Sequence, residues 1–266
     1  MRDMLVYVIA DYGQLHDLAF AEVTQRLHAE LKDMDADIKL YAVPAFDTVA
    51  TGFMLAQTAV NSKLGLRHKF FVNTAPRKDD LSPRVKNAGE GFAYARLHND
   101  VEICAVNSGF SLSFIKASAK EIRAVNCKKD GTQFRSRDIF PPAFGKIVHG
   151  DYGDLGDDIR DAVPDHPQNA VCYTDGYGNM KCSVDPAVLE PMKGQDATLS
   201  INGHNQNVRC AEGIFGVADG DFCFSEGSSG WTLPDGKRVR FSEVVQRGGS
   251  AAKAFGMPAG GMKVSW

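Results

Sequence analysis

The chain has 266 residues, of which 44% are hydrophobic and 24% charged, so it has enough apolar side chains to bury a full core. Its formal net charge is -3 and no run of Lys or Arg is longer than two residues, which excludes the basic surface typical of nucleic-acid binding. The N-terminus holds only a short apolar run, far below membrane-spanning length. We therefore expect a cytoplasmic protein with neither a membrane nor a nucleic-acid partner.

The N-terminal half alternates between strand and helix patterns. Residues 5–10 are apolar and β-prone, and apolar side chains then recur every four positions from Leu15 to Leu31, which marks one helix face. Further strands are predicted at 38–43, 68–72, 92–95 and 101–106, and further helices at 47–60 and 137–148. This alternation predicts an α/β domain over residues 1–155, with a mainly parallel sheet and helices on both faces.

The composition changes after residue 150. Five Asp residues crowd positions 151–161, and Pro164 and Pro167 follow, which is typical of a linker. From residue 168 to residue 266 short β-prone runs alternate with Gly, Asn and Asp turns, and they lie at 171–174, 197–201, 208–210, 222–224 and 238–241. We expect a second, all-β domain there.

Motifs that are common in enzymes and metal proteins are missing. The chain has no Gly-rich dinucleotide or P-loop motif, no Gly-x-Ser-x-Gly elbow and no His-Glu-x-x-His. The six cysteines form no Cys-x-x-Cys pair and the seven histidines show no ligand spacing, so we expect free buried thiols and no metal site.

Five segments, in order along nearly the whole chain, carry a resemblance to a known family. The segments are residues 8–13 (VIADYG), 43–47 (VPAFD), 105–109 (AVNSG), 134–140 (FRSRDIF) and 173–179 (YTDGYGN). In the same order, they are similar to the family patterns T-D-F-G, P-x-[FW]-D, A-P-[DN]-N-G, F-H-G-R-D-[IL]-F and Y-I-D-x-F-G-N. Each motif alone is common in loops. With all five segments in this order, the chain resembles the S-adenosylmethionine hydroxide adenosyltransferase (hydrolase) family, which also contains the bacterial fluorinase and chlorinase.

The C-terminal region is similar to the same family over residues 228–230 (SSG) and 247–252 (RGGSAA). The resemblance implies an N-terminal α/β domain, a C-terminal β-barrel domain and a homotrimer. It places the ligand sites at subunit interfaces, between the N-terminal domain of one chain and the C-terminal domain of its neighbour. The substrate would be S-adenosylmethionine, and the reaction needs no cofactor.

The resemblance assigns several N-terminal residues to substrate binding. Asp11 follows a strand and would accept both ribose hydroxyl protons, although an Asp in this position can also cap the next helix. Phe46 would pack against the ribose or adenine edge, whereas a Phe after Pro-Ala is ordinarily a core residue. The other binding residues in these segments are Asn107 and Phe134.

The resemblance assigns the other end of the substrate to the C-terminal domain. Asp175 would pair with the α-amino group, or serve only as a turn residue of an Asp-Gly hairpin. Tyr177 can stack on adenine, and Asn179 offers the donor and acceptor that its N6/N7 edge needs. Ser228 and Ser229 would hold the methionine carboxylate, or belong to a flexible Ser/Gly loop. The last residue of this set is Arg247.

The residues around the nucleophile depart from the family pattern. Ser136 follows a strand-like Gln133–Phe134 pair, and its hydroxyl can point at a bound anion or water, or cap the helix that follows. Family hydrolases orient water with an Asp-Arg-His set, and in this chain the corresponding positions hold Asn73, Asp80 and Arg135. A neutral Asn cannot take a proton, and an Arg is no base near neutral pH.

The leading hypothesis is hydrolysis of S-adenosylmethionine at ribose C5′, which gives adenosine and L-methionine. A sulfonium is a good leaving group, so positioning and desolvating the nucleophile supply most of the rate. The first alternative is a synthase of 5′-halo-5′-deoxyadenosine, favoured by Arg135 and Ser136. The second is a binder of adenosyl ligands without turnover, favoured by the altered water-orienting set.

Overall fold

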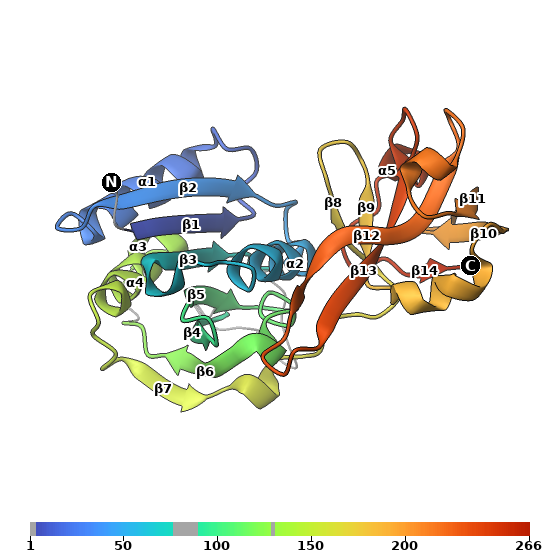
Figure 1. The fold of residues 1–266 in the computed structure, drawn as a ribbon. Coiled ribbons are helices and arrows are strands. Elements are labelled where there is room, and N and C mark those ends of the chain that lie inside the picture. The colour runs from blue at the N-terminus through green and yellow to red at the C-terminus, as the bar shows by residue number, and fades with distance from the viewer. Residues whose placement is uncertain (1–3, 77–89, 129–130) are drawn as a thin grey trace. The chain divides into compact units, whose positions relative to one another are not determined.

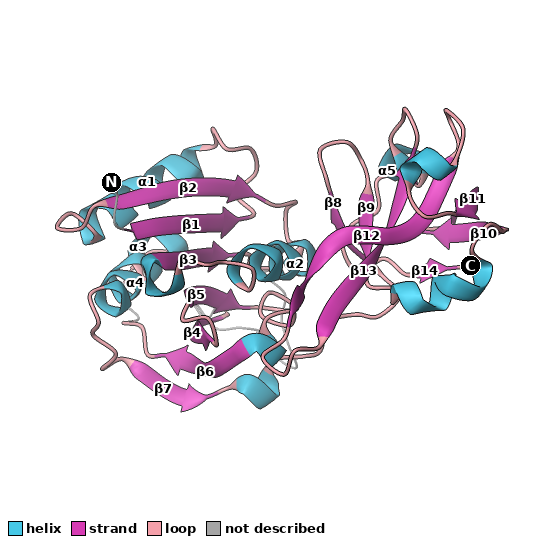
Figure 2. Cartoon of the chain, viewed as in Figure 1, coloured by secondary structure: helices cyan, strands magenta, loops and turns pink. Residues whose placement is uncertain are grey.

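The computed structural model describes residues 4–76, 90–128 and 131–266. The chain divides into two compact units, Met1–Asp165 and His166–Trp266, and each unit holds one seven-stranded sheet. The first unit is an α/β fold and the second is an all-β, barrel-like fold, as the sequence predicts (Figure 2). The boundary falls later than residue 155, because the acidic stretch belongs to the first unit.

The first sheet has the strand order β2-β1-β3-β5-β4-β6-β7 (Figure 1). Its strands are β1 (Met4–Ala10), β2 (Ala36–Ala42), β3 (His68–Asn73), β4 (Gly91–Leu97), β5 (Glu102–Asn107), β6 (Ala119–Val125) and β7 (Leu155–Asp158). β2, β1, β3 and β5 run parallel, whereas β4, β6 and β7 are antiparallel to their neighbours. The carboxyl ends of the four parallel strands therefore meet at one edge.

The prediction of a linker is wrong for the acidic stretch at residues 151–161, because part of this stretch forms β7. This strand pairs with β6 through Arg123↔Asp158 and Val125↔Leu155. It lies at the edge of the sheet, where charged side chains face water and discourage pairing with another chain. The acidic composition thus reflects an edge strand, and β6, which no sequence pattern indicated, supplies its partner.

Helices cover both faces of this sheet (Figure 1). α1 (Leu18–Glu30) begins at Asp17, whose carboxylate accepts from the backbone N–H of Ala19, and it packs with α4 (Phe140–Val148) on the face to which Val6 and Val8 point. α2 (Thr48–Ala59) contacts β1 and β3 from the other face. Strand alternation sends successive side chains to the two faces, so both are buried.

The helix expected over 137–148 is two helices, α3 (Arg135–Asp138) and α4. Pro141 and Pro142 occupy the first turn of α4. Neither has a backbone N–H, so the hydrogen bonds that would continue α3 through this point are missing. Proline is tolerated in a first turn, and the second helix starts there.

The second sheet has the order β14-β10-β11-β12-β13-β9-β8. Its strands are β8 (Val171–Thr174), β9 (Met180–Cys182), β10 (Asp196–Ile201), β11 (His204–Cys210), β12 (Phe222–Thr232), β13 (Arg238–Gln246) and β14 (Val264–Ser265), and one short helix, α5 (Ala251–Ala254), accompanies them. A bridge between Ala170 and Lys263 joins the two ends of the sheet. This closure makes the sheet barrel-like and removes most of its free edge.

The cysteines are all free and five of the six are buried, as expected from their spacing. None of the helices in the described ranges is both long enough and apolar enough to cross a membrane.

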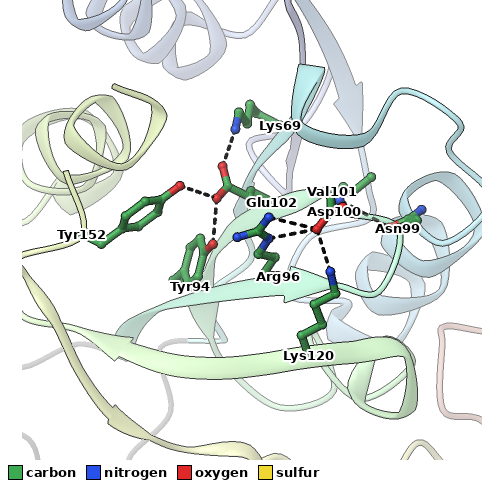
Figure 3. A network of polar contacts seen from close by, with 9 residues as sticks. All are labelled: Lys69, Tyr94, Arg96, Asn99, Asp100, Val101, Glu102, Lys120 and Tyr152. Carbon is green, nitrogen blue, oxygen red and sulfur yellow. Dashed lines mark hydrogen bonds and ion pairs between the residues drawn. The ribbon is translucent and has the colours of Figure 1, made fainter. Parts of the chain in front are cut away.

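A buried ion pair joins β3 to β5 near the amino ends of these strands (Figure 3). The Lys69 ammonium donates to the Glu102 carboxylate, and both residues are almost fully buried. The phenol groups of Tyr94 and Tyr152 each donate to the other Glu102 oxygen at 2.7 Å. Side chains from four segments thereby form hydrogen bonds with one another, and a buried charge needs such partners.

We expect Glu102→Gln to lower the free energy of unfolding by about 3–5 kcal/mol, because the Lys69 ammonium would stay buried without its counter-charge. Asp165→Asn is the matched control, since Asp165 forms an exposed pair with Lys116 and should cost far less. Urea unfolding followed by circular dichroism measures both. Equal losses would show that the buried pair contributes no more than a surface pair.

His68 is a buried titratable group beside this network. Its Nδ1 shares a 2.8 Å hydrogen bond with the Ser62 hydroxyl, while Nε2 is buried without a partner among the described residues. The ring packs edge-on against Tyr7, with centroids 4.5 Å apart. Burial lowers the pKa of His68 to about 4.

This lowered pKa predicts a pH dependence of stability. Above about pH 6.5 the imidazole is neutral in both states, but below it the unfolded chain takes up a proton that the folded chain does not bind until about pH 4. Stability should therefore fall as the pH drops from 6.5 to 4. His68→Gln should flatten this slope in pH-dependent urea melts, whereas the same change at the exposed His98 should leave it as in the wild type. An unchanged slope in His68→Gln would assign the pH dependence to other groups.

Candidate functional site

Four of the predicted site residues lie where the parallel strands end. Asp11 follows β1, Phe46 follows β2, and Asn73 and Asn107 are the last residues of β3 and β5. Ligands of open α/β sheets bind at this edge, because the strands end there and their loops diverge. The structure thus brings these four residues to one edge of the first unit.

Asp11 connects three of the strand ends. Its Oδ2 accepts from the backbone N–H of Phe46 at 2.9 Å, and its own N–H donates to the carbonyl of Asn73 at 3.2 Å. The helix that follows is capped by Asp17, so the alternative that Asp11 is a helix cap is wrong. Asp11 instead holds the turn after β2 against the ends of β1 and β3.

Phe46 has an unusual backbone and an exposed ring. Its φ is 63°, in the left-handed region that side chains other than glycine rarely adopt. The ring is 53% exposed, so the alternative that Phe46 is a core residue is wrong. The hydrogen bond from its N–H to Asp11 helps to hold this conformation, and strained residues of this kind gather at functional sites.

Buried hydroxyl groups support this edge from below. Thr51 of α2 hydrogen-bonds Thr74 through their Oγ1 atoms at 2.8 Å. Ser108 donates to the carbonyl of Thr74 and lies 3.2 Å from the Ser111 hydroxyl. The loops after β3 and β5 are therefore tied to each other and to the start of α2, which makes the edge rigid.

Ser136 lies inside α3, with 5% of its surface exposed. Gln133 and Phe134 form no strand, and the residue before α3 is Phe134, which makes no capping bond, so the strand-like interpretation and the capping alternative are both wrong. Tyr12, next to Asp11, packs its ring against Phe134 at 6.2 Å between centroids. Burial raises the pKa of Tyr12, the Ser136 hydroxyl opposes this rise, and Asp11 adds to it. The contact with Phe134 thus brings Asp11 and Tyr12 to the start of α3, which contains Ser136.

Arg135 lies at the start of α3, next to Ser136, and contacts the segment that leads into β4. Its Nη1 donates to the carbonyl of Glu90 at 2.7 Å, and its guanidinium lies 4.8 Å from the centroid of the Phe140 ring. The neighbouring Arg137 pairs with Asp138 and Glu22. Asp80 lies outside the described residues.

In the second unit, Asp175 organises the turn between β8 and β9. Its Oδ1 accepts from the backbone N–H of Tyr177 at 2.9 Å and of Asn179 at 3.0 Å, and its Oδ2 accepts from the Asn179 side chain at 3.1 Å. The turn alternative for Asp175 is therefore confirmed. With the bond from Lys181, each oxygen of the Asp175 carboxylate accepts two hydrogen bonds, so a further role toward a ligand would rest on its charge.

The Asp175 carboxylate also pairs with a partly buried lysine. Lys181 of β9 donates to Asp175 at 2.7 Å and to Glu243 of β13. Burial alone would raise the pKa of Asp175, but the Lys181 ammonium and the bonds from Asn179 outweigh it and hold this pKa below its usual range. Two carboxylates share one ammonium, so the cluster has a net charge of about -1 at neutral pH.

Two of the family-like segments meet at this turn. The N–H of Ala252 donates to the carbonyl of Gly178 at 2.9 Å, and a side chain at Gly178 would collide with Ser250. Gly178 is therefore required here, and it brings the 247–252 segment against the 173–179 turn. Tyr177 is 82% exposed beside this contact.

Ser228 and Ser229 do not lie in a flexible loop, so that alternative is wrong. They belong to β12, at a register shift between Glu226 and Gly230. Such a bulge re-aims side chains and often lies at a site. Two contacts hold the Arg247 side chain in place. Its Nη1 donates to the carbonyl of Val217 at 2.6 Å, and its Nε pairs with Asp219 at 3.0 Å.

Sequence reasoning missed three residues that the structure puts at these places. Tyr12 lies in the segment 8–13, where the family pattern T-D-F-G has phenylalanine, and its additional hydroxyl is the signal in the sequence that could have indicated it. Lys181 and Glu243 carried no signal, because their pairing with Asp175 arises from strand register between β9 and β13. Within the described ranges, no group of three or more His, Cys, Asp or Glu is placed to hold a metal ion.

Comparisons with known proteins show a fold and no family. No protein-family model matches the chain, and no curated protein matches it. An uncharacterized conserved protein from Thermotoga maritima is similar in structure, with a TM-score of 0.72 and 15% identity, and 98% of each chain is covered. A conserved hypothetical protein from Thermus thermophilus has a TM-score of 0.65 and 19% identity, also over 98% of each chain. At these identities the likeness concerns the fold alone.

We expect Asp175→Asn to lower the free energy of unfolding by about 1–2 kcal/mol, because it removes the charge that Lys181 meets in a partly buried position. Asp235→Asn is the matched control, since Asp235 accepts only the Lys237 N–H in an exposed turn and pairs with no ammonium among the described residues. Thermal unfolding by calorimetry compares the two variants. Equal melting temperatures would mean that Asp175 acts as an ordinary turn residue.

Proposed function

We propose that the protein hydrolyses S-adenosylmethionine to adenosine and L-methionine. The observation that carries this proposal is the group at the carboxyl edge of the first sheet. There Asp11 holds an exposed, strained Phe46, and Ser136 is buried close by. A carboxylate and an exposed aromatic ring can bind a ribose, and a buried hydroxyl beside them can bind the nucleophile. The segments that resemble the hydrolase family supply the substrate class.

The proposed reaction is an in-line displacement at carbon. A water oxygen forms a bond to ribose C5′ while the bond from C5′ to sulfur breaks, its electron pair goes to sulfur, and the water proton passes to solvent. Asp11 would accept the two ribose hydroxyls, and Phe46 would pack on the sugar or the adenine edge. Asn73, buried at the end of β3, can accept a hydrogen bond from water without taking its proton. The rate would then come from position and desolvation.

The same proposal assigns the adenine and methionine ends to residues of the second unit. Tyr177 presents an exposed ring for stacking, and the net negative cluster of Asp175, Lys181 and Glu243 suits an α-amino group. Ser228 and Ser229 would meet the carboxylate from the bulge of β12. A homotrimer in the cytoplasm, with neighbouring subunits completing each site, belongs to this proposal as well.

Halide use is the second candidate, and Ser136 is the residue that favours it. Water ranks ahead because the Arg135 guanidinium, the charge that would attract an anion, already donates to the backbone carbonyl of Glu90 and packs on the Phe140 ring. Binding without turnover is the third candidate and follows from the uncharged Asn73.

The test is to incubate the purified protein with S-adenosylmethionine, with and without chloride or fluoride, and to identify nucleosides by mass spectrometry. We expect adenosine in all samples. A 5′-halo-5′-deoxyadenosine would select the halide candidate, and tight binding by calorimetry without any product would select the third. Absence of both binding and product would overturn the proposal.

Asp11→Asn probes the site within the same assay. It keeps an oxygen for the Phe46 N–H but loses the charge that two ribose hydroxyls would meet, so we expect KM to rise roughly tenfold or more. Asp17→Asn is the matched control, because it caps α1 in an exposed position a few residues away. Equal KM values for the two variants would place ribose binding elsewhere.

A further inference from the structure

We propose that the Tyr12 phenol and the Ser136 hydroxyl together hold the water that attacks C5′, which makes Tyr12 a further residue of the reaction. This inference rests on the proposed function and names the groups that position its nucleophile. It concerns only residues of the first unit.

The first observation is that the Tyr12 phenol is buried and bonds no described residue. Its Oη belongs to a small set of buried polar atoms without a hydrogen-bond partner in the described part of the chain. Such a group costs free energy in a folded protein and calls for a functional explanation. A small polar molecule that accepts from the phenol provides one.

The second observation is that the Tyr12 ring is held in one orientation. It packs edge-on against Phe20, with centroids 5.0 Å apart, and edge-on against Phe134 at 6.2 Å. Phe20 lies in α1 and Phe134 precedes α3, so two separate elements grip the ring. A phenol fixed in this way can aim its hydroxyl without paying the entropy of ordering it during the reaction.

The third observation is the neighbourhood of the hydroxyl. Ser136 is 5% exposed and lies in α3, two residues after Phe134, whose ring packs against the ring of Tyr12. The Ser136 hydroxyl also lowers the pKa of the phenol, against the effect of burial. Asp11, the proposed ribose ligand, directly precedes Tyr12 and is held by the Phe46 N–H. A water molecule that bonds both hydroxyls would therefore lie beside the sugar, where an attack on C5′ starts.

The chemistry of the phenol defines what it can do. Burial raises the pKa of Tyr12, and Asp11 raises it further, so the phenol stays protonated at neutral pH. It can donate a hydrogen bond but cannot serve as a base. Tyr12 and Ser136 would fix the place and direction of the water, and the proton would leave only as the bond to carbon forms.

Tyr12→Phe tests the inference, because it removes one oxygen and keeps the ring packing. We expect kcat for adenosine formation to fall roughly ten- to hundredfold, with KM within about twofold of the wild type. The melting temperature should stay equal or rise, since a hydroxyl without a partner among the described residues is removed. A purely structural role would lower the melting temperature instead.

Tyr94→Phe is the matched control. Its phenol is also buried, but it donates to Glu102 at 2.7 Å and lies near the opposite ends of the strands. We expect Tyr94→Phe to lower the melting temperature and to leave kcat unchanged. The two variants should thus show opposite patterns in the same pair of measurements.

The combination of Tyr12→Phe with Ser136→Ala gives a second readout. If both hydroxyls hold the same water, the double variant should lose much less than the product of the two single losses in kcat. Full activity of Tyr12→Phe, or strictly multiplicative losses, would overturn the inference and leave the proposed function intact. A wild-type protein that forms no adenosine would overturn the proposed function itself, and with it the role of this water.

Discussion

The hydrogen bond from the Phe46 N–H to the Asp11 carboxylate is the contact on which the arrangement of the first unit's edge depends. It joins the turn after β2 to the end of β1, while the Asp11 N–H reaches the end of β3. Because the strands are parallel, one short polar residue can connect three of their ends. The same bond holds Phe46 in a left-handed conformation that exposes its ring. A single carboxylate therefore fixes both the arrangement of the strand ends and the strained backbone of Phe46. In the proposed function, the same carboxylate also binds the ribose.

Buried polar groups lie at both ends of the first sheet. Near the amino ends of β3 and β5, Glu102 accepts hydrogen bonds from Lys69, Tyr94 and Tyr152, and this buried network stabilises the fold (Figure 3). Near the carboxyl ends, the Tyr12 phenol is buried with no partner among the described residues. Satisfied networks give rigidity, and unsatisfied groups cost stability that function can justify. At the amino ends, His68 Nε2 is also buried without a partner among the described residues, so this property alone does not distinguish the two ends. The carboxyl edge is the stronger candidate for chemistry because Asp11 and the exposed, strained Phe46 lie there beside Tyr12.

The patterns of contiguous residues predicted most of the elements. Periodicity located β1, α1, β2, α2, β3, β4 and β5, and the glycine and proline positions indicated a change of fold after residue 150. The misses have local causes. The sequence of β7 resembles a linker because an exposed edge strand is as polar as one. The helix predicted over 137–148 is divided because Pro141 and Pro142 remove the bonds that would continue it.

The sequence by itself determined the α/β and all-β division, the free cysteines, the modest net charge and the motifs that suggest an adenosyl substrate. These depend on composition and on residues that are neighbours along the chain. Only the tertiary structure decided that Lys181 pairs Asp175 with Glu243, that Arg135 bonds the backbone carbonyl of Glu90, and that the Tyr12 ring packs against Phe134 just before α3. Such contacts join residues far apart in sequence, and the packing of strands and helices selects them, so no local pattern encodes them.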